Sequence, residues 1–258
     1  MSKKTLLGRV AESLLTKRRT TALILAAGSG ERFSEGSGEL SGLKKQFVPI
    51  CGVPVLLRTV RVFERSPFIH EIIVVTGKDD VDFVRDLLGD EITKLTKIVP
   101  GGATRQESAM AGLEAVDPKS EYIAIHDGAR CLITEEIIEN VIKTAYDCGA
   151  AAAAQRAVDT VKFADNNRII TETIDRDHVW LMKTPQVFHA NMYRAAVYTA
   201  YKDGASVTDD CMLVERIGFK VRVVDCGSEN IKLTYPIDKV FAEAILNERV
   251  RKTQEGTK

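Results

Sequence analysis

The sequence predicts an α/β fold with a mainly parallel sheet, and two patterns support that prediction. Short apolar, β-rich runs recur along the chain, and several are almost continuously apolar, as in strands that are buried on both faces. Segments with helical periodicity lie between them, and this alternation is typical of a parallel sheet flanked by helices. We therefore expect a Rossmann-like sheet with helices on both sides in this 258-residue chain.

The expected strands are the β-rich runs at residues 21–27, 71–77, 121–127, 220–226 and 230–234. The expected helices occupy residues 54–66, 80–88, 104–116 and 134–149. Gly149 ends the last of these as a left-handed cap, and Thr208 and Asp209 fit an N-cap before a further helical segment. Ligands of open parallel sheets bind at the carboxyl ends of the strands, so we look for chemistry there.

One segment interrupts the alternation of strand and helix. Residues 157–176 contain two extended runs on either side of an Asn-Asn pair, which is typical of a β-hairpin. We expect this hairpin to project from the core as an arm over about residues 155–178, and it carries Thr160 and Arg176.

Composition limits the class of protein. Lys and Arg number 36, and so do Asp and Glu, so the net charge is zero and a protein that coats nucleic acid is disfavoured. No run of 18 apolar residues exists, so we expect no membrane span. The five cysteines form no CxxC pair, which favours a reducing, cytoplasmic location. We expect one domain over residues 21–253 after a basic helical extension over residues 1–20.

The first expected strand runs into the glycine-rich turn AAGSG at residues 26–30. A turn of this kind is compatible with plain chain reversal, but its backbone N–H groups also attract anions. Arg32 and Lys45 lie beyond it, separated by a Gly/Ser-rich patch that has the composition of a mobile lid, and their charges suit a polyphosphate. Phe33 stands where a dinucleotide fingerprint requires its third glycine.

Two further strand ends carry residues that suit a nucleotide. Gly101 and Gly102 precede a helical pattern whose exposed N–H groups suit a carbonyl or an anion, and Arg105 and Ser108 share one face of that helix. Asp127 ends an apolar strand, where a carboxylate can hold Mg²⁺ or a ribose hydroxyl. No GxSxG, HExxH or zinc spacing supports nucleophilic or zinc-dependent catalysis.

Ordered motifs give the chain a resemblance to a known family. They are, in order, AAGSGER, KKQF, GGATRQES, HDGAR, VDTVK, TIDR, KTPQVF, SVTDD and NIKLT. Together they resemble the 2-C-methyl-D-erythritol 4-phosphate cytidylyltransferases over about residues 21–247. The resemblance implies a nucleotidyltransferase domain that moves a cytidylyl group from CTP to that acceptor and releases pyrophosphate, in non-mevalonate isoprenoid precursor synthesis.

The resemblance also implies roles for residues at matching positions. The expected catalytic cations, which face the α-phosphate, are Arg32, Lys45 and Lys232. The residues expected to bind CTP are Ala26, Ala27, Gly28, Gly30, Gly101, Gly102, Arg105, Ser108 and Asp127. Asp127 is also the expected Mg²⁺ ligand. The acceptor is expected to contact Arg130, Thr160, Arg176 and Thr184, with the arm reaching across a two-fold homodimer.

The chain departs from the family pattern at three places and leaves further functions open. Ala103 and Cys131 stand where the family often has Asp and Pro, and the interval between Arg32 and Lys45 is longer than usual. A ribitol-5-phosphate cytidylyltransferase shares most motifs, although TIDR and Trp180 favour the methylerythritol enzyme. A nucleotidyltransferase for another base, a nicotinamide-dependent oxidoreductase and a non-catalytic nucleotide-binding module are also compatible with parts of the pattern, and the missing third glycine argues against the oxidoreductase.

Overall fold

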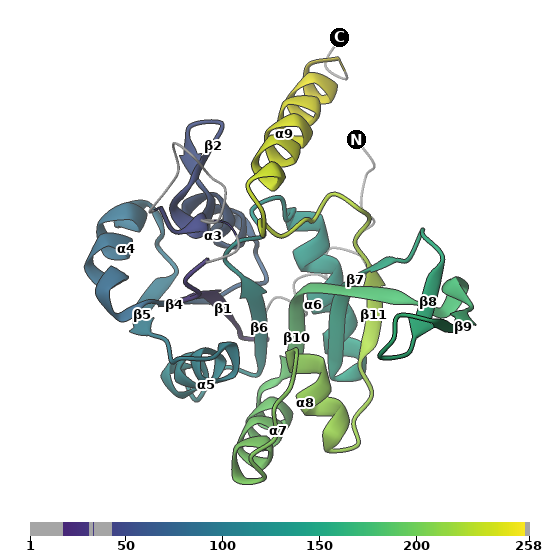
Figure 1. Ribbon diagram of the computed structural model, residues 1–258. Coiled ribbons are helices and arrows are strands. Elements are labelled where there is room, and N and C mark those ends of the chain that lie inside the picture. The colour runs from purple at the N-terminus through teal and green to yellow at the C-terminus, as the bar shows by residue number, and fades with distance from the viewer. Residues whose placement is uncertain (1–17, 31–32, 34–42, 256–258) are drawn as a thin grey trace, which may run out of the picture.

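The computed structural model describes residues 18–30, 33 and 43–255, and a seven-stranded sheet forms its centre (Figure 1). The strands are β1 (Thr20–Ala26), β4 (Glu71–Thr76), β5 (Leu95–Pro100), β6 (Tyr122–Asp127), β7 (Ala150–Arg156), β10 (Trp180–His189) and β11 (Arg222–Asp225). Their order is β11-β7-β10-β6-β1-β4-β5. Only β10 runs antiparallel to its neighbours among these strands, so the predicted mainly parallel sheet is confirmed.

Helices cover both faces of this sheet, which is why every residue of β4 and β6 is buried. One face packs against α3 (Val55–Arg65), α4 (Val81–Leu88) and α6 (Glu135–Cys148). The other packs against α5 (Arg105–Ala115), α7 (Ala190–Lys202) and α8 (Asp210–Arg216). Alternation along β1 divides its side chains between the faces, with Ala22 and Ile24 in the first core cluster and Leu23 in the second.

Local signals set the ends of these helices. The Thr104 hydroxyl accepts from Glu107 N–H and the Glu107 side chain accepts in return, so a capping box begins α5. Asp209 accepts from Met212 N–H at the start of α8, which confirms the predicted N-cap. Gly149 has φ +88° and ends α6, as the sequence predicted.

A third core cluster lies at the carboxyl edge of the sheet, beneath α9 (Ile237–Glu255). It joins residues that are distant in sequence, among them Phe33, Leu132, Leu233 and Ala242. The short hairpin of β2 (Pro49–Ile50) and β3 (Val53–Pro54) packs beside it, and α9 projects from this edge in Figure 1.

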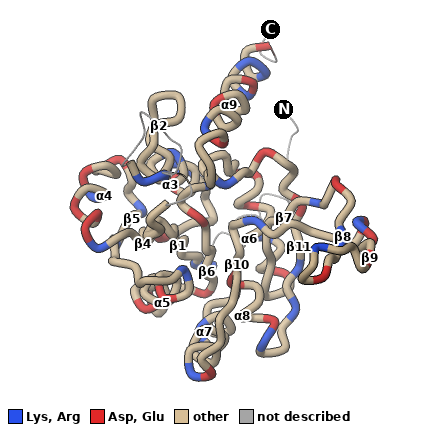
Figure 2. Tube along the Cα trace, in the orientation of Figure 1, with Lys and Arg blue, Asp and Glu red and all other residues tan. Residues whose placement is uncertain are grey.

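The remaining short elements are the 3₁₀ turns η2 (Lys45–Phe47), η3 (Lys78–Asp80), η4 (Gly89–Glu91) and η5 (Arg176–His178). Figure 2 shows charges of both signs spread over the helices and the arm.

The predicted hairpin arm is present as a separate antiparallel pair, β8 (Val161–Ala164) with β9 (Ile170–Ile174). It projects beyond β7 and β11, at the right of Figure 1. The Asp165 carboxylate organises the turn by accepting from the N–H groups of Asn167 and Ile169, both at 2.9 Å.

One expected strand is wrong, and three strands of the seven-stranded sheet and the short pair β2–β3 were not predicted. Residues 230–234 form no ladder, because the backbone and side chain of Asn230 bond to Arg130 and Thr184 and Leu233 N–H donates to Ala129 O. The unpredicted strands of the seven-stranded sheet are β5, β7 and β10. In β7 the run of five alanines lacks the β-branched residues that signal a strand.

Several expectations lie outside the described residues: most of the basic extension, the Gly/Ser-rich lid and Arg32. No helix in the described part of the chain is long and apolar enough to cross a membrane. All five cysteines are free, and Cys131, Cys211 and Cys226 are buried.

Candidate active site

A pocket of about 480 Å³ opens at the carboxyl ends of β1 and β6. The glycine turn, η2, the start of α5 and the segment after β11 all contribute to its wall. The lining residues are Leu25, Ala26, Ala27, Gly28, Ser29, Lys45, Gln46, Gly102, Ala103, Thr104, Arg105, Ser108, Asp127, Ala129 and Lys232. This is the strand edge at which the sequence analysis placed a ligand.

The glycine turn is held from inside by Gln46, which is 3% exposed. Its Nε2 donates to Ala26 O at 2.9 Å and to Gly28 O at 3.2 Å, which fixes the direction of the turn. The two neighbouring lysines have different environments. Lys44 Nζ donates to Asp80 Oδ2 at 2.5 Å, whereas Lys45 lines the pocket. The position of Lys45 therefore suits an anionic ligand better than that of Lys44.

Gly101 and Gly102 are required by close packing at the pocket wall. A Cβ on Gly101 would lie 2.5 Å from Ala27 Cβ and 2.6 Å from Ser108 Oγ, and one on Gly102 would collide with Glu107. Gly101 N–H donates to Thr76 O at 2.8 Å, which ties the turn to the end of β4. A larger residue at either position would push this wall into the pocket.

The start of α5 presents Arg105 and Ser108 to the pocket. The N–H groups of Ala103 and Thr104 already donate to the Glu107 carboxylate, at 2.6 and 3.1 Å. Ser108 Oγ donates to Thr104 O at 2.9 Å, so its lone pairs remain available to accept from a ligand.

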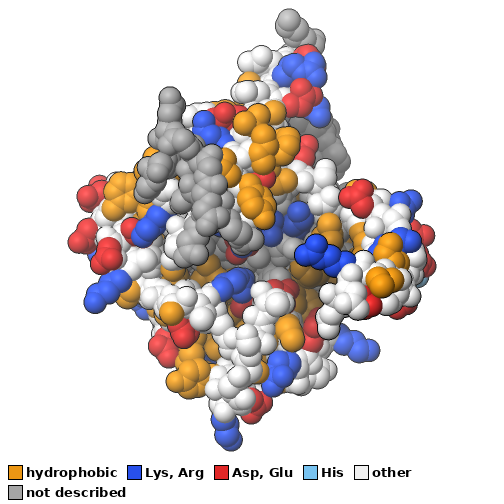
Figure 3. Space-filling model, in the orientation of Figure 1, with side chains coloured by type: hydrophobic (Ala, Val, Ile, Leu, Met, Phe, Trp, Pro, Cys, Tyr) orange, Lys and Arg blue, Asp and Glu red, His pale blue; other side chains and the backbone are white. Residues whose placement is uncertain are grey.

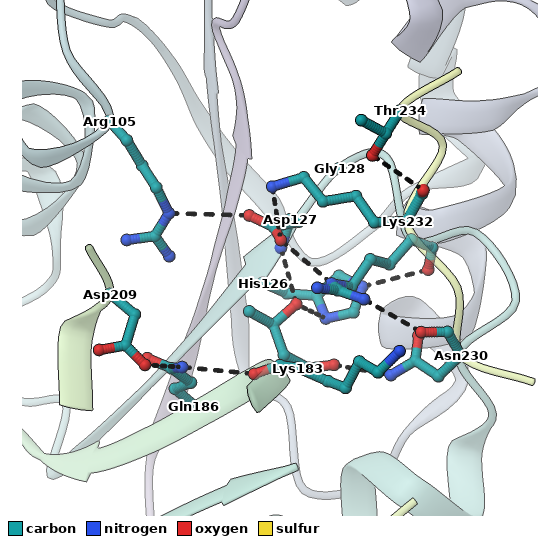
Figure 4. A network of polar contacts seen from close by, with 12 residues as sticks. Arg105, His126, Asp127, Gly128, Lys183, Gln186, Asp209, Asn230, Lys232 and Thr234 are labelled. Atoms are coloured by element: carbon teal, nitrogen blue, oxygen red, sulfur yellow. Dashed lines mark hydrogen bonds and ion pairs between the residues drawn. The ribbon is translucent and has the colours of Figure 1, made fainter. Parts of the chain in front are cut away.

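Asp127 is the acidic residue of the lining, and cations surround it (Figure 4). Its Oδ2 lies 3.0 Å from Lys232 Nζ and 3.1 Å from Arg130 Nε, and its Oδ1 lies 3.8 Å from Arg105 Nε. Burial alone would raise the pKa of Asp127, but Lys232, Arg130 and Arg105 together lower it far below its usual range. Arg105 also pairs with the Asp210 carboxylate, so these three cations face two carboxylates and leave one positive charge in excess, which suits an anionic ligand.

Behind Asp127, a buried network fixes the orientation of its neighbours. Asp127 N–H donates to Thr184 Oγ1 at 3.1 Å, and Asn230 Nδ2 donates to Thr184 O at 2.9 Å. His126 contacts Thr184 Oγ1 through Nδ1 at 3.0 Å and Arg130 O through Nε2 at 3.3 Å. Because Arg130 O can only accept, Nε2 carries the proton. Burial lowers the pKa of His126 to about 3, so the imidazole is a neutral packing group.

A second network positions Arg105 from α7 and α8. Arg105 Nη2 donates to Asp210 Oδ2 at 2.6 Å, and Tyr193 Oη donates to Asp210 Oδ1 at 2.6 Å. Gln186 Oε1 accepts from the N–H groups of Asp210 and Cys211, both at 3.1 Å. Desolvation alone would lower the pKa of Arg105, but Asp210 and Asp127 raise it above its ordinary value, so its charge is permanent.

Sequence reasoning missed Gln46, Asp210, Tyr193 and Lys183 as members of the site. In SVTDD, the N-cap explained Asp209 without any further function. It gave no sign that the neighbouring Asp210 accepts a hydrogen bond from Arg105. Lys183 precedes Thr184, and burial followed by the charge of Arg130 lowers the pKa of its ammonium. A half-buried lysine beside an arginine was not visible in the sequence, because their approach depends on the packing of β10 against β6.

The structure brings most of the expected residues together. Arg130 and Thr184, at 8% and 4% exposure, lie behind Asp127 rather than in the pocket lining. Thr160 and Arg176 do not join the pocket, since both are exposed on the arm, where Arg176 Nη1 donates to Val158 O at 2.7 Å.

Within the described ranges, no group of three or more His, Cys, Asp or Glu residues could hold a metal ion. Asp127 is the carboxylate that the pocket lining offers to a cation. A metal held here would therefore take its other ligands from the substrate or from water.

Comparison with known proteins agrees with this geometry. The family model described as 2-C-methyl-D-erythritol 4-phosphate cytidylyltransferase matches residues 20–248. A relative of that name from Syntrophus aciditrophicus is 41% identical over 242 residues, covering 93% of this chain and 99% of the relative. One from Symbiobacterium thermophilum is 42% identical and covers 90% of this chain and 94% of its own.

Solved structures give the same result. The 4-diphosphocytidyl-2C-methyl-D-erythritol synthase of Anaerococcus prevotii superposes with a TM-score of 0.81 at 33% identity, covering 91% of this chain and 99% of its own. The ordered motifs, the strand-edge pocket and these likenesses agree along nearly the whole length. The chain belongs to the 2-C-methyl-D-erythritol 4-phosphate cytidylyltransferase family.

Proposed function

We propose that the chain transfers the cytidylyl group of CTP to the phosphate of 2-C-methyl-D-erythritol 4-phosphate and releases pyrophosphate, in isoprenoid precursor synthesis. One observation carries the proposal beyond family membership: Asp127 meets Lys232 and Arg130 within 3.1 Å at the end of a glycine-walled pocket. Family membership favours this activity over a ribitol-5-phosphate cytidylyltransferase and over a nicotinamide-dependent oxidoreductase.

Two parts of the pocket hold two parts of CTP, the cytosine and the triphosphate. The cytosine lies against the wall of Gly102 and Ser108, where a Cβ on Gly102 or on the adjacent Gly101 would collide with neighbouring side chains. The triphosphate lies along the glycine turn, between Lys45 and Lys232. Arg32 belongs to this end by resemblance and lies outside the described residues.

The chemistry needs positioned charge and no general base. The second pKa of a phosphate monoester is about 6, so the acceptor is mostly dianionic at neutral pH and attacks the α-phosphorus directly. His126 cannot abstract a proton from it, because the imidazole is buried and bonded to Thr184 and Arg130. Lys45 and Lys232 hold and stabilise the charge that builds on the α-phosphate, and the pocket aligns the reacting oxygen.

The residues fit a divalent cation such as Mg²⁺, which typically binds one or two carboxylates together with substrate phosphates. Asp127 supplies one carboxylate, and its Oδ1 lies 3.8 Å from Arg105, farther than Oδ2 lies from Lys232 and Arg130. When bound, Mg²⁺ neutralises charge on the triphosphate. Lys232 can then turn from Asp127 toward the phosphates, because its side chain is 34% exposed.

The acceptor end requires the arm of a second copy of the chain. Thr160 and Arg176 lie outside the pocket lining of their own chain. The arm also exposes apolar side chains, with Val158 at 69%, Phe163 at 57%, Ile169 at 62% and Ile170 at 61% (Figure 3). Apolar surface of this kind supports burial in a homodimer in which each arm completes the neighbouring site.

Five free cysteines support a cytoplasmic location.

The test is pyrophosphate release from CTP and Mg²⁺ with two acceptors in parallel, 2-C-methyl-D-erythritol 4-phosphate and ribitol 5-phosphate. We expect a clear preference in kcat/KM for the first. Preference for ribitol 5-phosphate would reassign the acceptor, and release with neither would reject the proposed activity. Omission of Mg²⁺ tests the cation in the same assay, and sedimentation of the purified chain tests the dimer.

A further inference from the structure

A second pocket, of about 380 Å³, lies away from the active site between α3, α9 and the loop that follows β6. Four arginines line it, together with one carboxylate, apolar side chains and the start of α6. The lining residues are Val53, Arg58, Arg61, Val62, Arg65, Cys131, Ile133, Thr134, Glu135, Leu246 and Arg249. We call it the arginine pocket.

Three of its arginines have carboxylate partners near the surface. Arg61 pairs with Glu91 at 3.0 Å, Arg65 with Glu135 at 2.5 Å and Arg249 with Glu229 at 2.8 Å. The six side chains are 29–57% exposed, and surface pairs of this kind contribute about 1 kcal/mol or less. An entering anion can therefore replace these carboxylates at small cost.

Arg58 differs from the other three arginines. Its Nη2 donates to Ile50 O at 2.7 Å, and within the described ranges it has no ion pair. Its Nε is buried without a hydrogen-bond partner. A guanidinium carries five N–H donors in a fixed fork, and although the buried Nε cannot reach a ligand, the Nη groups of Arg58 keep donors beyond the bond to Ile50 O.

The rest of the pocket suits an anion with a small apolar body. Val53, Val62, Ile133 and Leu246 form apolar wall. Burial raises the pKa of Cys131 to about 11, so the thiol stays neutral and adds no negative charge to the pocket. The four guanidinium groups oppose the single lining carboxylate of Glu135.

We propose that the arginine pocket binds a phosphate group, either free or carried by a small organic molecule. The arginine fork matches phosphate oxygens bidentately. A volume of about 380 Å³ lies in the range of small-ligand sites and leaves room beside the phosphate for a short hydrocarbon.

The arginine pocket is joined to the active site through Arg249. Its Nη2 donates to Leu132 O at 3.0 Å and pairs with Glu229, which adjoins Asn230. Asn230 O in turn accepts from Arg130 at 3.0 Å. The Arg249–Glu229 pair therefore links the arginine pocket to the segment that carries Asn230 and Lys232.

Isothermal titration of the full chain with phenyl phosphate, without CTP, tests the site. We expect Arg58→Gln and Arg65→Gln each to weaken binding about tenfold, which corresponds to about 1.4 kcal/mol. Arg85→Gln is the matched control, because Arg85 pairs with Asp82 on α4, away from the arginine pocket, and should bind as the wild type does. Thermal unfolding confirms that each variant is folded.

Lys45→Ala distinguishes binding in the arginine pocket from binding in the active site. Wild-type affinity in Lys45→Ala supports the proposal, whereas loss in Lys45→Ala with retention in Arg58→Gln and Arg65→Gln places the phosphate in the active site and overturns it. Absence of binding to the wild type at about 10 mM, weaker than typical metabolite sites, also overturns it. A parallel titration with inorganic phosphate distinguishes the source: equal affinity assigns free phosphate, and tighter binding of phenyl phosphate assigns an organic phosphate.

Discussion

The two ends of the proposed site are built in different ways. At the nucleotide end, Asp127, Arg130 and Thr184 are at most 8% exposed and hydrogen-bonded to one another or to neighbouring strands. At the arm, Thr160 and Arg176 are exposed, and the Arg176 guanidinium donates to the backbone of its own hairpin at Val158 O. The proposed nucleotide end is therefore preorganised within one chain, whereas the proposed acceptor residues on the arm are exposed and belong to no buried network of the described residues.

This difference separates two kinds of sequence change. A substitution at the nucleotide end acts on a closed network, so it alters chemistry or stability within one chain. A substitution on the arm leaves the fold of that chain intact and alters what the arm meets. The predictions below test this contrast, from the largest expected effect to the smallest.

The largest effect is expected from Lys45→Ala at the nucleotide end. Removing one preorganised cation from the α-phosphate costs about 3–4 kcal/mol of barrier, so kcat should fall by about 10²–10³. Lys44→Ala is the matched control, because Lys44 pairs with Asp80 outside the pocket lining. Comparable losses in both variants, measured by steady-state pyrophosphate release, would contradict the placement of the triphosphate.

At the arm, Arg176→Ala should reduce kcat/KM for the acceptor by about thirtyfold, or about 2 kcal/mol, through loss of a charge-assisted hydrogen bond. KM for CTP should not change, because the nucleotide pocket contains no arm residue. A rise in both KM values would mean that the arm also shapes the nucleotide pocket.

Mixing two impaired variants tests whether the arm acts across a dimer. In a mixed dimer of Arg176→Ala and Lys232→Ala chains, one site keeps both groups, so random exchange should restore about one quarter of wild-type activity. No recovery after verified exchange would place each arm in its own active site. Mixing the same two variants after each has been cross-linked as a homodimer, so that the chains cannot exchange, serves as the control and should show no recovery.

The sequence predicted the framework of this site because its signals are local. Apolar runs gave β1, β4 and β6, and their ends placed the glycine turn and Asp127 at one sheet edge. Turn residues gave the arm, since an Asn-Asn pair between extended runs needs no tertiary information.

The rest depended on contacts between distant segments. Arg105 meets Asp210 across 105 positions, and Arg130 meets Asn230 across 100. No periodic pattern reports such contacts. The expected strand at residues 230–234 failed for the same reason, because its polar groups bond to Arg130 and Thr184 rather than to a ladder.

The buried end should also give the protein a pH dependence that the arm does not. Burial lowers the pKa of His126 to about 3, against about 6.5 in the unfolded chain, so between these values the unfolded state binds the extra proton. The neutral His126 therefore contributes its full share of the free energy of unfolding above about pH 6.5. That free energy falls by about 2 kcal/mol as the pH is lowered to 5.

Urea unfolding of His126→Gln across this pH range isolates that contribution. Glutamine keeps a donor for Arg130 O and does not titrate. The slope of the free energy of unfolding against pH should therefore be smaller in the variant than in the wild type, by the equivalent of about one bound proton. His178→Gln on the arm, where the His178 side chain is 86% exposed, serves as the control for the substitution itself. Equal slopes in the wild type and His126→Gln would show that His126 charges without penalty in the folded state.

The smallest effect is expected at the tip of the arm. Arg168 adopts φ +65°, a left-handed conformation that costs a residue with a Cβ about 1 kcal/mol and that asparagine tolerates better. Arg168→Asn should therefore slow amide exchange in β8 and β9 by about two- to fivefold, equivalent to about 0.5–1 kcal/mol. The urea midpoint of the whole chain should not move, because the β8–β9 hairpin is a separate sheet. Arg168→Ala retains the conformational cost and should show no gain. If amide exchange in β8 and β9 is equally fast in the two variants, the turn does not limit opening of the arm. The opening would then be governed by the segments that join the arm to β7 and β10.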